Sequence, residues 1–198
     1  VVFTPNYAEA VINASCNHWG QNNPEAIVLH FTRGELSAAL AEFQTRDRTS
    51  AHYVIDRDGT VYQTMPESYG ARHVTCIAGC LECCPTYLCG DNHPELHSIG
   101  IELVNQGQVR DDWQGPIYED YNMAFGNRYW DDYPSAQLQA LTGLLLDITA
   151  RYGIPLDADH IIAHSRIQQK ADPGPALNLF EARTGNPPRE AILKDDLP

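Results

Sequence analysis

The stretch from residue 26 to 31, Ala-Ile-Val-Leu-His-Phe, is the feature that most limits how this chain can fold. It is a short, nearly continuous apolar run, which is typical of a strand covered on both of its faces. A strand of this kind needs packing layers above and below its sheet. The run therefore indicates a sheet with helices packed against it, and it carries a histidine, His30, just before its end.

Four more segments have the composition of strands: residues 51–55, 60–65, 98–104 and 161–164. Between the first two stands Asp58-Gly59, a pair typical of a tight hairpin turn. The spacing of apolar residues predicts one helix over about 35–45 and another from about 135 to Gly153. Strands mixed with helices, without an internal repeat, predict an α/β fold in which helices flank a single mixed β-sheet.

The length of 198 residues suits one domain better than two. We therefore expect a single domain over residues 1–198, with a core at 26–183 and two insertions at about 71–97 and 106–133. Hydrophobic residues make up 43% of the chain, which excludes wholesale disorder. No apolar run approaches the roughly 18 residues that a membrane span needs, so no membrane span is predicted.

The charge of the chain excludes one class of partner. It has 13 basic and 26 acidic residues, a formal net charge of −13. Proteins that bind nucleic acid through phosphate contacts need clustered Lys and Arg. We therefore predict no nucleic-acid partner. We also expect the protein to bind its partner through contacts within a groove rather than through electrostatic adhesion to an anionic surface.

Five of the six cysteines lie between Cys76 and Cys89, so they belong to one local feature. Disulfides there would place the protein outside the cytoplasm, secreted or periplasmic. The alternative is a small structural zinc site that uses Cys80, Cys83 and Cys89 with His93 or His97. We favour disulfides because the Cys83-Cys84 doublet does not fit the two spaced pairs of most zinc knuckles, but six cysteines allow 15 pairings.

The second insertion is rich in aromatic and acidic residues and has no helix or strand pattern. Aromatic rings such as Trp113 and Tyr118 can stack on sugar or peptide, which makes them candidate substrate-binding residues. The alternative, which we slightly favour, is that the aromatic residues cover the edge of the sheet as a secondary core. Loops this long in a small domain are usually functional or held in place.

Three side chains could together bind a metal ion. His30 and His164 lie near the ends of predicted strands, and Asp172 follows in the rigid turn Asp172-Pro173-Gly174-Pro175. Two imidazoles and one carboxylate would leave the fourth tetrahedral position of zinc open for water. Each of these residues alone has a simpler structural explanation, so the hypothesis depends on their combination.

The combination of motifs resembles a known family. Five blocks occur in order: residues 28–32 (VLHFT), 50–59 (SAHYVIDRDG), 97–105 (HSIGIELVN), 163–165 (AHS) and 170–175 (KADPGP). Together they resemble the zinc-dependent N-acetylmuramoyl-L-alanine amidases of the type-2 amidase group, which are related to the peptidoglycan recognition proteins. The resemblance spans about residues 26–180. It implies a mixed sheet with flanking helices and a zinc groove along one face.

The resemblance also implies an activity and a role for several residues. The bond cleaved would be the amide between the lactyl group of N-acetylmuramic acid and the first L-alanine of the stem peptide. His30, His164 and Asp172 match the zinc ligands, Glu102 matches the general base, and Lys170 matches the residue that stabilises the oxyanion. Burial in an apolar strand should raise the pKa of Glu102 and suit it to moving a proton.

Two questions stay open at this level. The chain could be a recognition module that binds muramyl peptides without cutting them, although the complete set of ligands and acid–base residues favours hydrolysis. His52 could face the groove and contact substrate, or it could form hydrogen bonds within the sheet. We expect the protein to be a monomer with peptidoglycan or a muramyl peptide as its partner.

Overall fold

The apolar run at 26–31 forms a strand, β3, inside a six-stranded mixed sheet. This computed structural model describes residues 8–11, 17–76, 84–121, 126 and 128–177. The strands of the sheet, in spatial order, are β1 (Ala8–Val11), β5 (Val61–Gln63), β4 (Tyr53–Ile55), β7 (Ser98–Leu103), β3 (Ala26–Phe31) and β10 (Ile161–Ala163). Only β4 and β5 pair antiparallel, and the other four pairs are parallel. All five predicted strands are therefore confirmed, β3 with the predicted bounds and the other four with shorter ones.

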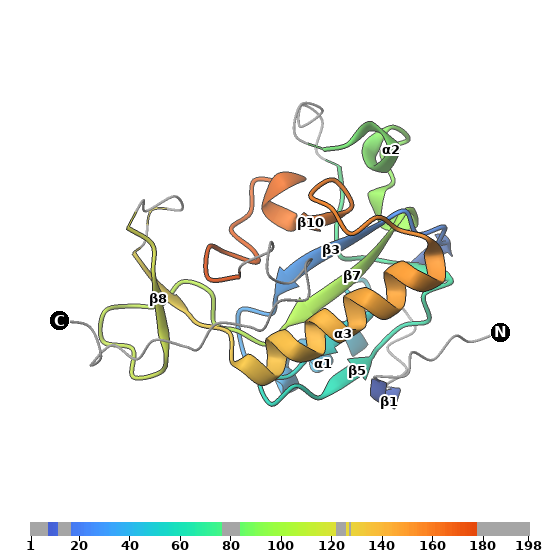
Figure 1. The fold of residues 1–198 in the computed structure, drawn as a ribbon. Coiled ribbons are helices and arrows are strands. Elements are labelled where there is room, and N and C mark those ends of the chain that lie inside the picture. Colours follow the sequence, from blue (N-terminus) through green and yellow to red (C-terminus); the bar gives the residue numbers. More distant parts are fainter. Residues whose placement is uncertain (1–7, 12–16, 77–83, 122–125, 127, 178–198) are drawn as a thin grey trace.

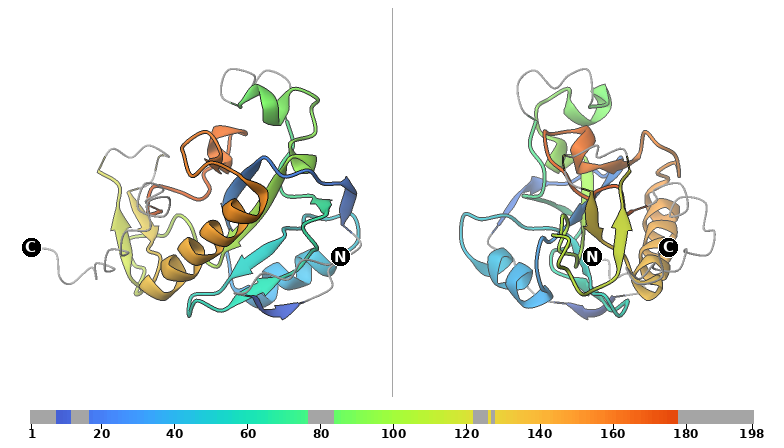
Figure 2. Two further views of the ribbon diagram at one scale, coloured as in Figure 1. Left: turned by 45° about the vertical axis from the view of Figure 1, so that its right-hand side comes forward. Right: turned by 90° about the vertical axis from the view of Figure 1, so that its left-hand side faces the viewer.

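Two helices cover opposite faces of this sheet, as Figure 2 shows in its right-hand view. Helix α3 (Ser135–Tyr152) packs Leu141, Leu144, Leu145 and Ile148 onto the sheet in the main core. It ends at Gly153, whose φ of 70° is the left-handed conformation that glycine adopts readily. On the other face lies α1 (Leu36–Gln44), and the two predicted helices are thereby confirmed (Figure 1).

Alternation along the parallel strands decides which face each side chain occupies. Ile27 and Leu29 of β3 point into the core beneath α3, with Ile99 and Ile101 of β7 beside them. The opposite face has two smaller apolar clusters, one around Phe43 of α1 and one around Val28 and Ile162. His30 lies two residues after Val28, and Glu102 lies two residues after Gly100, the register partner of Val28. Both side chains therefore lie on this second face.

Short elements surround the sheet. Their bounds are β2 (His18–Gln21), β6 (Tyr69–Ala71), α2 (Thr86–Cys89), the 3₁₀ turns η1 (Pro94–Leu96) and η2 (His164–Arg166), β8 (Ile117–Glu119) and β9 (Tyr129–Asp131). Strands β2 and β6 form one two-stranded sheet, and β8 and β9 form another. No helix in the described part of the chain is both long and apolar enough to cross a membrane.

The aromatic segment differs from its prediction as a stretch without strands. It contains the antiparallel pair of β8 and β9, which extends from one end of the molecule (Figure 1). Each strand has three residues, too few for a period-two pattern to be visible in the sequence. Trp130 of β9 and the nearby Tyr133 are 1% exposed and belong to the main core, so this part of the insertion has a structural role.

Part of the cysteine-rich insertion is described, and it contains a disulfide between Cys84 and Cys89. The sulfur of Cys76 lies within 4.8 Å of these two sulfurs. The residues of the zinc alternative have other partners here: His93 pairs with Glu95, and His97 pairs with Asp91. Cys16, Cys80 and Cys83 lie outside the described residues, as do residues 178–183 of the predicted core.

Candidate metal centre and active site

The parallel pairing of β3 with β10 brings two histidines together. Ala163 lies opposite Leu29, so His164, the next residue, lies beside His30. The Nδ1 atoms of the two rings are 3.0 Å apart. Asp172 returns to the same point from the loop after η2, and its Oδ2 lies 3.0 Å from Nδ1 of His30 and 2.7 Å from Nδ1 of His164. The structure thus brings together all three residues predicted to bind a metal.

These three donor atoms fit a divalent metal ion. Zinc bonds of about 2.0–2.1 Å to N and O place tetrahedral ligand atoms about 3.3 Å apart, so small shifts of these side chains would suffice. Burial, together with the neighbouring His164, lowers the pKa of His30 to about 4. Burial alone would raise the pKa of Asp172, but hydrogen bonds with His164 and His30 outweigh it and lower this pKa. A neutral imidazole and an ionised carboxylate are the forms that bind metal.

A chain of hydrogen bonds holds the outer side of the His30 ring. Nε2 of His30 lies 3.0 Å from Nδ1 of His73, and Nε2 of His73 lies 3.3 Å from Oγ of Ser98. The Ser98 hydroxyl donates to the carbonyl of Pro94 at 2.6 Å. A metal ion at Nδ1 of His30 leaves the ring hydrogen on Nε2, so His73 accepts it and donates in turn to Ser98. Each bond in this chain then has one consistent direction.

His164 has a similar support. Its Nε2 is hydrogen-bonded to the side-chain oxygen of Gln168, whose Nε2 donates to Oγ1 of Thr75 at 3.1 Å. His73 and Thr75 both belong to the segment that leads into the cysteine-rich insertion. This insertion therefore begins with residues that orient both histidines of the candidate metal centre.

Sequence reasoning missed His73 and Gln168. A signal for His73 exists in β7, where Ser98 and Gly100 are small residues on the face that carries Glu102. A Cβ at residue 100 would overlap the His73 ring, so glycine is needed for close approach. Burial and the nearby His30 lower the pKa of His73 well below its ordinary value, which keeps the ring neutral as the hydrogen-bond chain requires.

Glu102 lies on the strand next to His30 and is its register partner. One carboxylate oxygen, Oε2, is buried and has no hydrogen-bond partner among the described residues. Burial, followed by the negative charge of Asp172, raises the pKa of Glu102 to about 8. An unpartnered carboxyl group with a pKa near neutrality can both accept and release a proton at physiological pH.

A pocket of about 270 Å³ opens over these groups. Its lining includes the three candidate ligands, Glu102, His73 and the exposed Lys170, and it continues to Phe31 and Arg33. Lys170 thus lies in the same pocket as the candidate ligands, as its predicted role requires.

The loop that carries Asp172 is supported by the aromatic insertion. The Tyr133 hydroxyl donates to the carbonyl of Pro173 at 2.7 Å. Trp130 packs so closely beneath Gly174 that a Cβ there would lie 2.8 Å from the indole ring, and the φ of Gly174 is 77°. The buried aromatic residues therefore position a candidate metal ligand.

Three residues predicted to contact substrate lie elsewhere. His52 is 0% exposed, its Nδ1 accepts a hydrogen bond from the backbone of Gly100, and its Nε2 lies 2.8 Å from the carbonyl of Tyr69. It therefore joins backbone segments, which is the structural alternative of the two considered for it. Trp113 and Tyr118 are not among the residues that line the 270 Å³ pocket, and Tyr118 packs against the main core.

Comparison with known proteins agrees with this arrangement. The family model described as N-acetylmuramoyl-L-alanine amidase (Amidase_2) matches residues 20–175, which include every candidate ligand and Glu102. The chain belongs to this amidase family. The match ends at Pro175, just after the loop that carries Asp172, so the family region contains the site described above and every strand of the six-stranded sheet except β1.

A curated relative within this family is N-acetylmuramoyl-L-alanine amidase AmiD of Escherichia coli (strain K12). It is 31% identical over 160 residues, which cover 76% of this chain and 49% of AmiD. The chain therefore spans about half the length of the curated relative that it matches.

Two solved structures of similar fold contain muramyl peptides. AmiD of E. coli, in complex with the substrate anhydro-N-acetylmuramic acid-L-Ala-D-γ-Glu-L-Lys, has a TM-score of 0.60 at 26% identity, over 83% of this chain and 58% of that one. AMPDH3 of Pseudomonas aeruginosa, in complex with an anhydromuramic pentapeptide, has a TM-score of 0.58 at 28% identity, over 82% and 60% of the two chains.

Proposed function

We propose that this protein is a zinc-dependent N-acetylmuramoyl-L-alanine amidase that hydrolyses the amide between N-acetylmuramic acid and L-alanine of the stem peptide. One observation carries the proposal. The donor atoms of His30, His164 and Asp172 lie within 3.0 Å of one another, beside a carboxyl group, Glu102, that has a buried oxygen without a hydrogen-bond partner. Family membership supplies the bond and the substrate class.

His30, His164 and Asp172 would hold the zinc ion, which, when bound, supplies a Lewis acid for the scissile carbonyl and lowers the pKa of water. Glu102 takes a proton from the attacking water as the new C–O bond forms. It then gives this proton to the nitrogen of L-alanine as the C–N bond breaks, so the products are a free carboxyl group and a free amine. Its raised pKa suits both transfers near neutral pH.

Lys170 places a positive charge at the edge of the same pocket. The carbonyl oxygen of the scissile amide gains negative charge as water adds to it. A well-placed cation there is worth on the order of 3 kcal/mol in the transition state. Lys170 is thus the oxyanion-stabilising residue in this proposal.

A recognition module that binds muramyl peptides without cutting them is the second candidate. Such a module has no use for an acid–base group, and a buried carboxyl group without hydrogen bonds lowers the stability of the fold. The presence of Glu102 beside a complete ligand set therefore favours hydrolysis.

The test is to incubate the purified, zinc-loaded protein with peptidoglycan and with small muramyl peptides and to identify the fragments by mass spectrometry. We expect released peptides with a free L-alanine amino terminus and one zinc ion per chain by elemental analysis. Chelation should stop release, and added zinc should restore it. Bound muramyl peptide without any release from the zinc-loaded protein would favour the recognition module.

We also propose that the protein acts outside the cytoplasm, in a secreted or periplasmic location. The Cys84–Cys89 disulfide supports this, because such bonds rarely persist in a reducing cytosol. Thiol counting on the denatured, unreduced protein from its natural compartment tests it. Six free thiols would contradict the proposal.

A further inference from the structure

Arg33 is one of few cations in the described chain that lack an acidic partner. Seven of the ten Lys and Arg residues in the described ranges make an ion pair with a carboxylate: Arg46, Arg57, Arg72, Arg110, Arg128, Arg151 and Arg166. The other three are Arg33, Arg48 and Lys170, and two of these line the pocket over the candidate metal centre. In a chain with a net charge of −13, unpaired cations gathered at one pocket point to an anionic ligand.

The backbone holds Arg33 in a conformation that a residue other than glycine rarely adopts. Its φ is 54°, in the left-handed region, which costs free energy for a side chain with a Cβ. Hydrogen bonds on both sides keep it there: the amide of Thr32 donates to Leu103 at 3.0 Å, and the amide of Gly34 donates to Asn105 at 3.2 Å. Local strain that neighbouring bonds maintain is typical of functional positions.

A second pocket begins at Arg33. Its volume is about 280 Å³, and it continues from the first pocket along α1 toward Phe43. Arg33, Thr49 and Glu102 line both pockets, so the two are parts of one groove that runs from the candidate metal centre past the guanidinium. A ligand with its reacting bond at the metal centre would thus place its next groups beside Arg33.

The chemistry of a muramyl peptide gives this groove a direction. The lactyl carboxyl group is consumed in the scissile amide, so the carboxylates lie on the peptide side of that bond. In the ligand of the AmiD complex, L-Ala is followed by D-γ-Glu, whose γ linkage leaves its α-carboxylate free. Adjacent Cα atoms are about 3.8 Å apart, so this carboxylate lies about 7 Å from the scissile bond, within reach of an arginine side chain that borders the same pocket.

We propose that Arg33 binds the α-carboxylate of the second stem-peptide residue, and that the groove beyond it along α1 holds the peptide half of the substrate. This specificity site rests on the proposed amidase function. A guanidinium presents paired N–H donors that match the two oxygens of a carboxylate, which a lysine does not. Arg33 would thereby select stem peptides with a free carboxylate over those in which this group is amidated.

The experiment compares two substrates that differ only at this group, N-acetylmuramoyl-L-Ala-D-Glu and N-acetylmuramoyl-L-Ala-D-isoglutamine. The readout is the ratio of their kcat/KM values. Arg33→Asn removes the charge and tolerates the left-handed backbone, and we expect it to lower the preference for the carboxylate substrate by roughly 10- to 100-fold, which corresponds to a lost charge-assisted hydrogen bond. Arg33→Lys, which keeps the charge but not the paired donors, should retain an intermediate preference.

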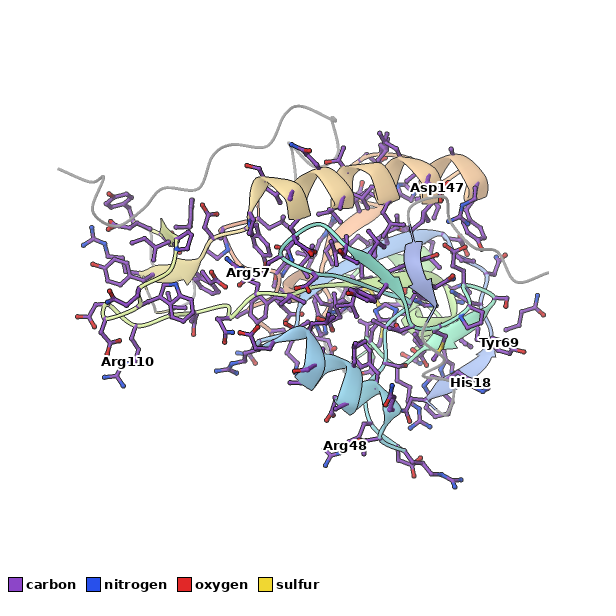
Figure 3. All side chains as sticks on the ribbon, turned by 90° about the horizontal axis from the view of Figure 1, so that it is seen from below. His18, Arg48, Arg57, Tyr69, Arg110 and Asp147 are labelled. Carbon is purple, nitrogen blue, oxygen red and sulfur yellow. A yellow bond between two sulfur atoms is a disulfide. The ribbon has the colours of Figure 1, made fainter. Side chains whose placement is uncertain are left out.

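Arg48→Asn is the matched control, because Arg48 is also unpaired among the described residues but lies at the outer end of α1 (Figure 3). It should leave the ratio unchanged. A ratio that is the same in wild type and Arg33→Asn would overturn the assignment of Arg33. If wild-type protein cleaves neither compound, the proposed function fails separately, and equilibrium binding of the two compounds then tests the role of Arg33. A binding preference for the carboxylate compound that Arg33→Asn abolishes supports this role. The absence of any preference overturns it.

Discussion

Glu67 and Glu102 are two poorly exposed carboxyl groups with opposite surroundings. Glu67 is 1% exposed, and each of its oxygens has two donors. Arg151 contacts both oxygens at 2.5 and 2.7 Å, Tyr53 donates at 2.8 Å and Tyr152 at 3.0 Å. Glu102 has a buried oxygen with no hydrogen-bond partner among the described residues. One carboxyl group is fully paired, and the other is left available.

This difference separates a structural carboxylate from a reactive one. A buried carboxylate with four donors is held in one geometry, and it joins α3 to the segment between β5 and β6. A buried carboxyl group without donors has its pKa raised and can exchange protons with a bound molecule. The same residue type thus serves the fold in one place and the proposed chemistry in the other, according to its partners.

The sharpest test of this contrast is Glu102→Gln. The amide keeps the size of the side chain but cannot take a proton from water, so we expect kcat to fall by about 10²- to 10⁴-fold. The zinc content by elemental analysis and the melting temperature should stay at or above the wild-type values. Turnover within tenfold of wild type would remove Glu102 from the mechanism.

Glu67→Gln should instead lower the stability of the fold and leave turnover unchanged. It removes the carboxylate that Arg151 contacts with two nitrogens and leaves Asp147, 2.8 Å away, as an acidic partner of Arg151. The free energy of unfolding should therefore fall by about 3 kcal/mol in urea denaturation, the lower end of the range for a broken buried pair. Turnover of the protein that remains folded should be close to wild type. The matched control is Glu119→Gln, whose partner Arg128 is 45% exposed, and which should cost less than about 1 kcal/mol. An equal loss in both variants would contradict a special role for the Glu67 network.

The raised pKa of Glu102 predicts how the stability of the metal-free protein depends on pH. The unfolded chain loses this proton near pH 4.5, whereas the folded chain keeps it until about pH 8. Between these values the folded state binds more protons, so this group lowers stability as pH rises. Below pH 6.5 the buried histidines act in the opposite direction, because they raise stability as pH rises. The difference in the free energy of unfolding between wild type and Glu102→Gln isolates the contribution of the carboxyl group. We expect that difference to grow by about 3 kcal/mol from pH 4 to pH 9.

The smallest effect that we predict concerns His73. Like Glu67, its side chain is held by hydrogen bonds, but it supports the candidate metal centre. His73→Phe removes the acceptor for His30 while it fills similar space. We expect zinc to bind about 10- to 100-fold more weakly in competition with a chelator. His18→Phe, at an exposed ring shown in Figure 3, is the control and should not change zinc affinity. Unchanged affinity in His73→Phe would show that the hydrogen-bond chain does not orient His30.

Much of the fold could be predicted because it depends on local pattern. The apolar run at 26–31 predicted a buried strand, and the spacing of Leu141, Leu145 and Ile148 predicted a helix that covers the sheet. The order of five short motifs was enough to propose His30, His164, Asp172, Glu102 and Lys170, which all line one pocket. The three-residue strands β8 and β9 and the pair β2 and β6 were not predicted, because elements this short are set by tertiary contacts.

By itself the sequence predicted the residues proposed for the chemistry and the strands that carry His30 and Glu102, since side-chain type and hydrophobic alternation are properties of the chain. Tertiary structure alone decided which polar side chains became partners. His73 supports His30 from 43 residues away, and Arg151 pairs with Glu67 across 84 residues. Burial and hydrogen bonding between such distant groups decide whether a carboxyl group is fully paired or left available, and those distances exist only after the chain has folded.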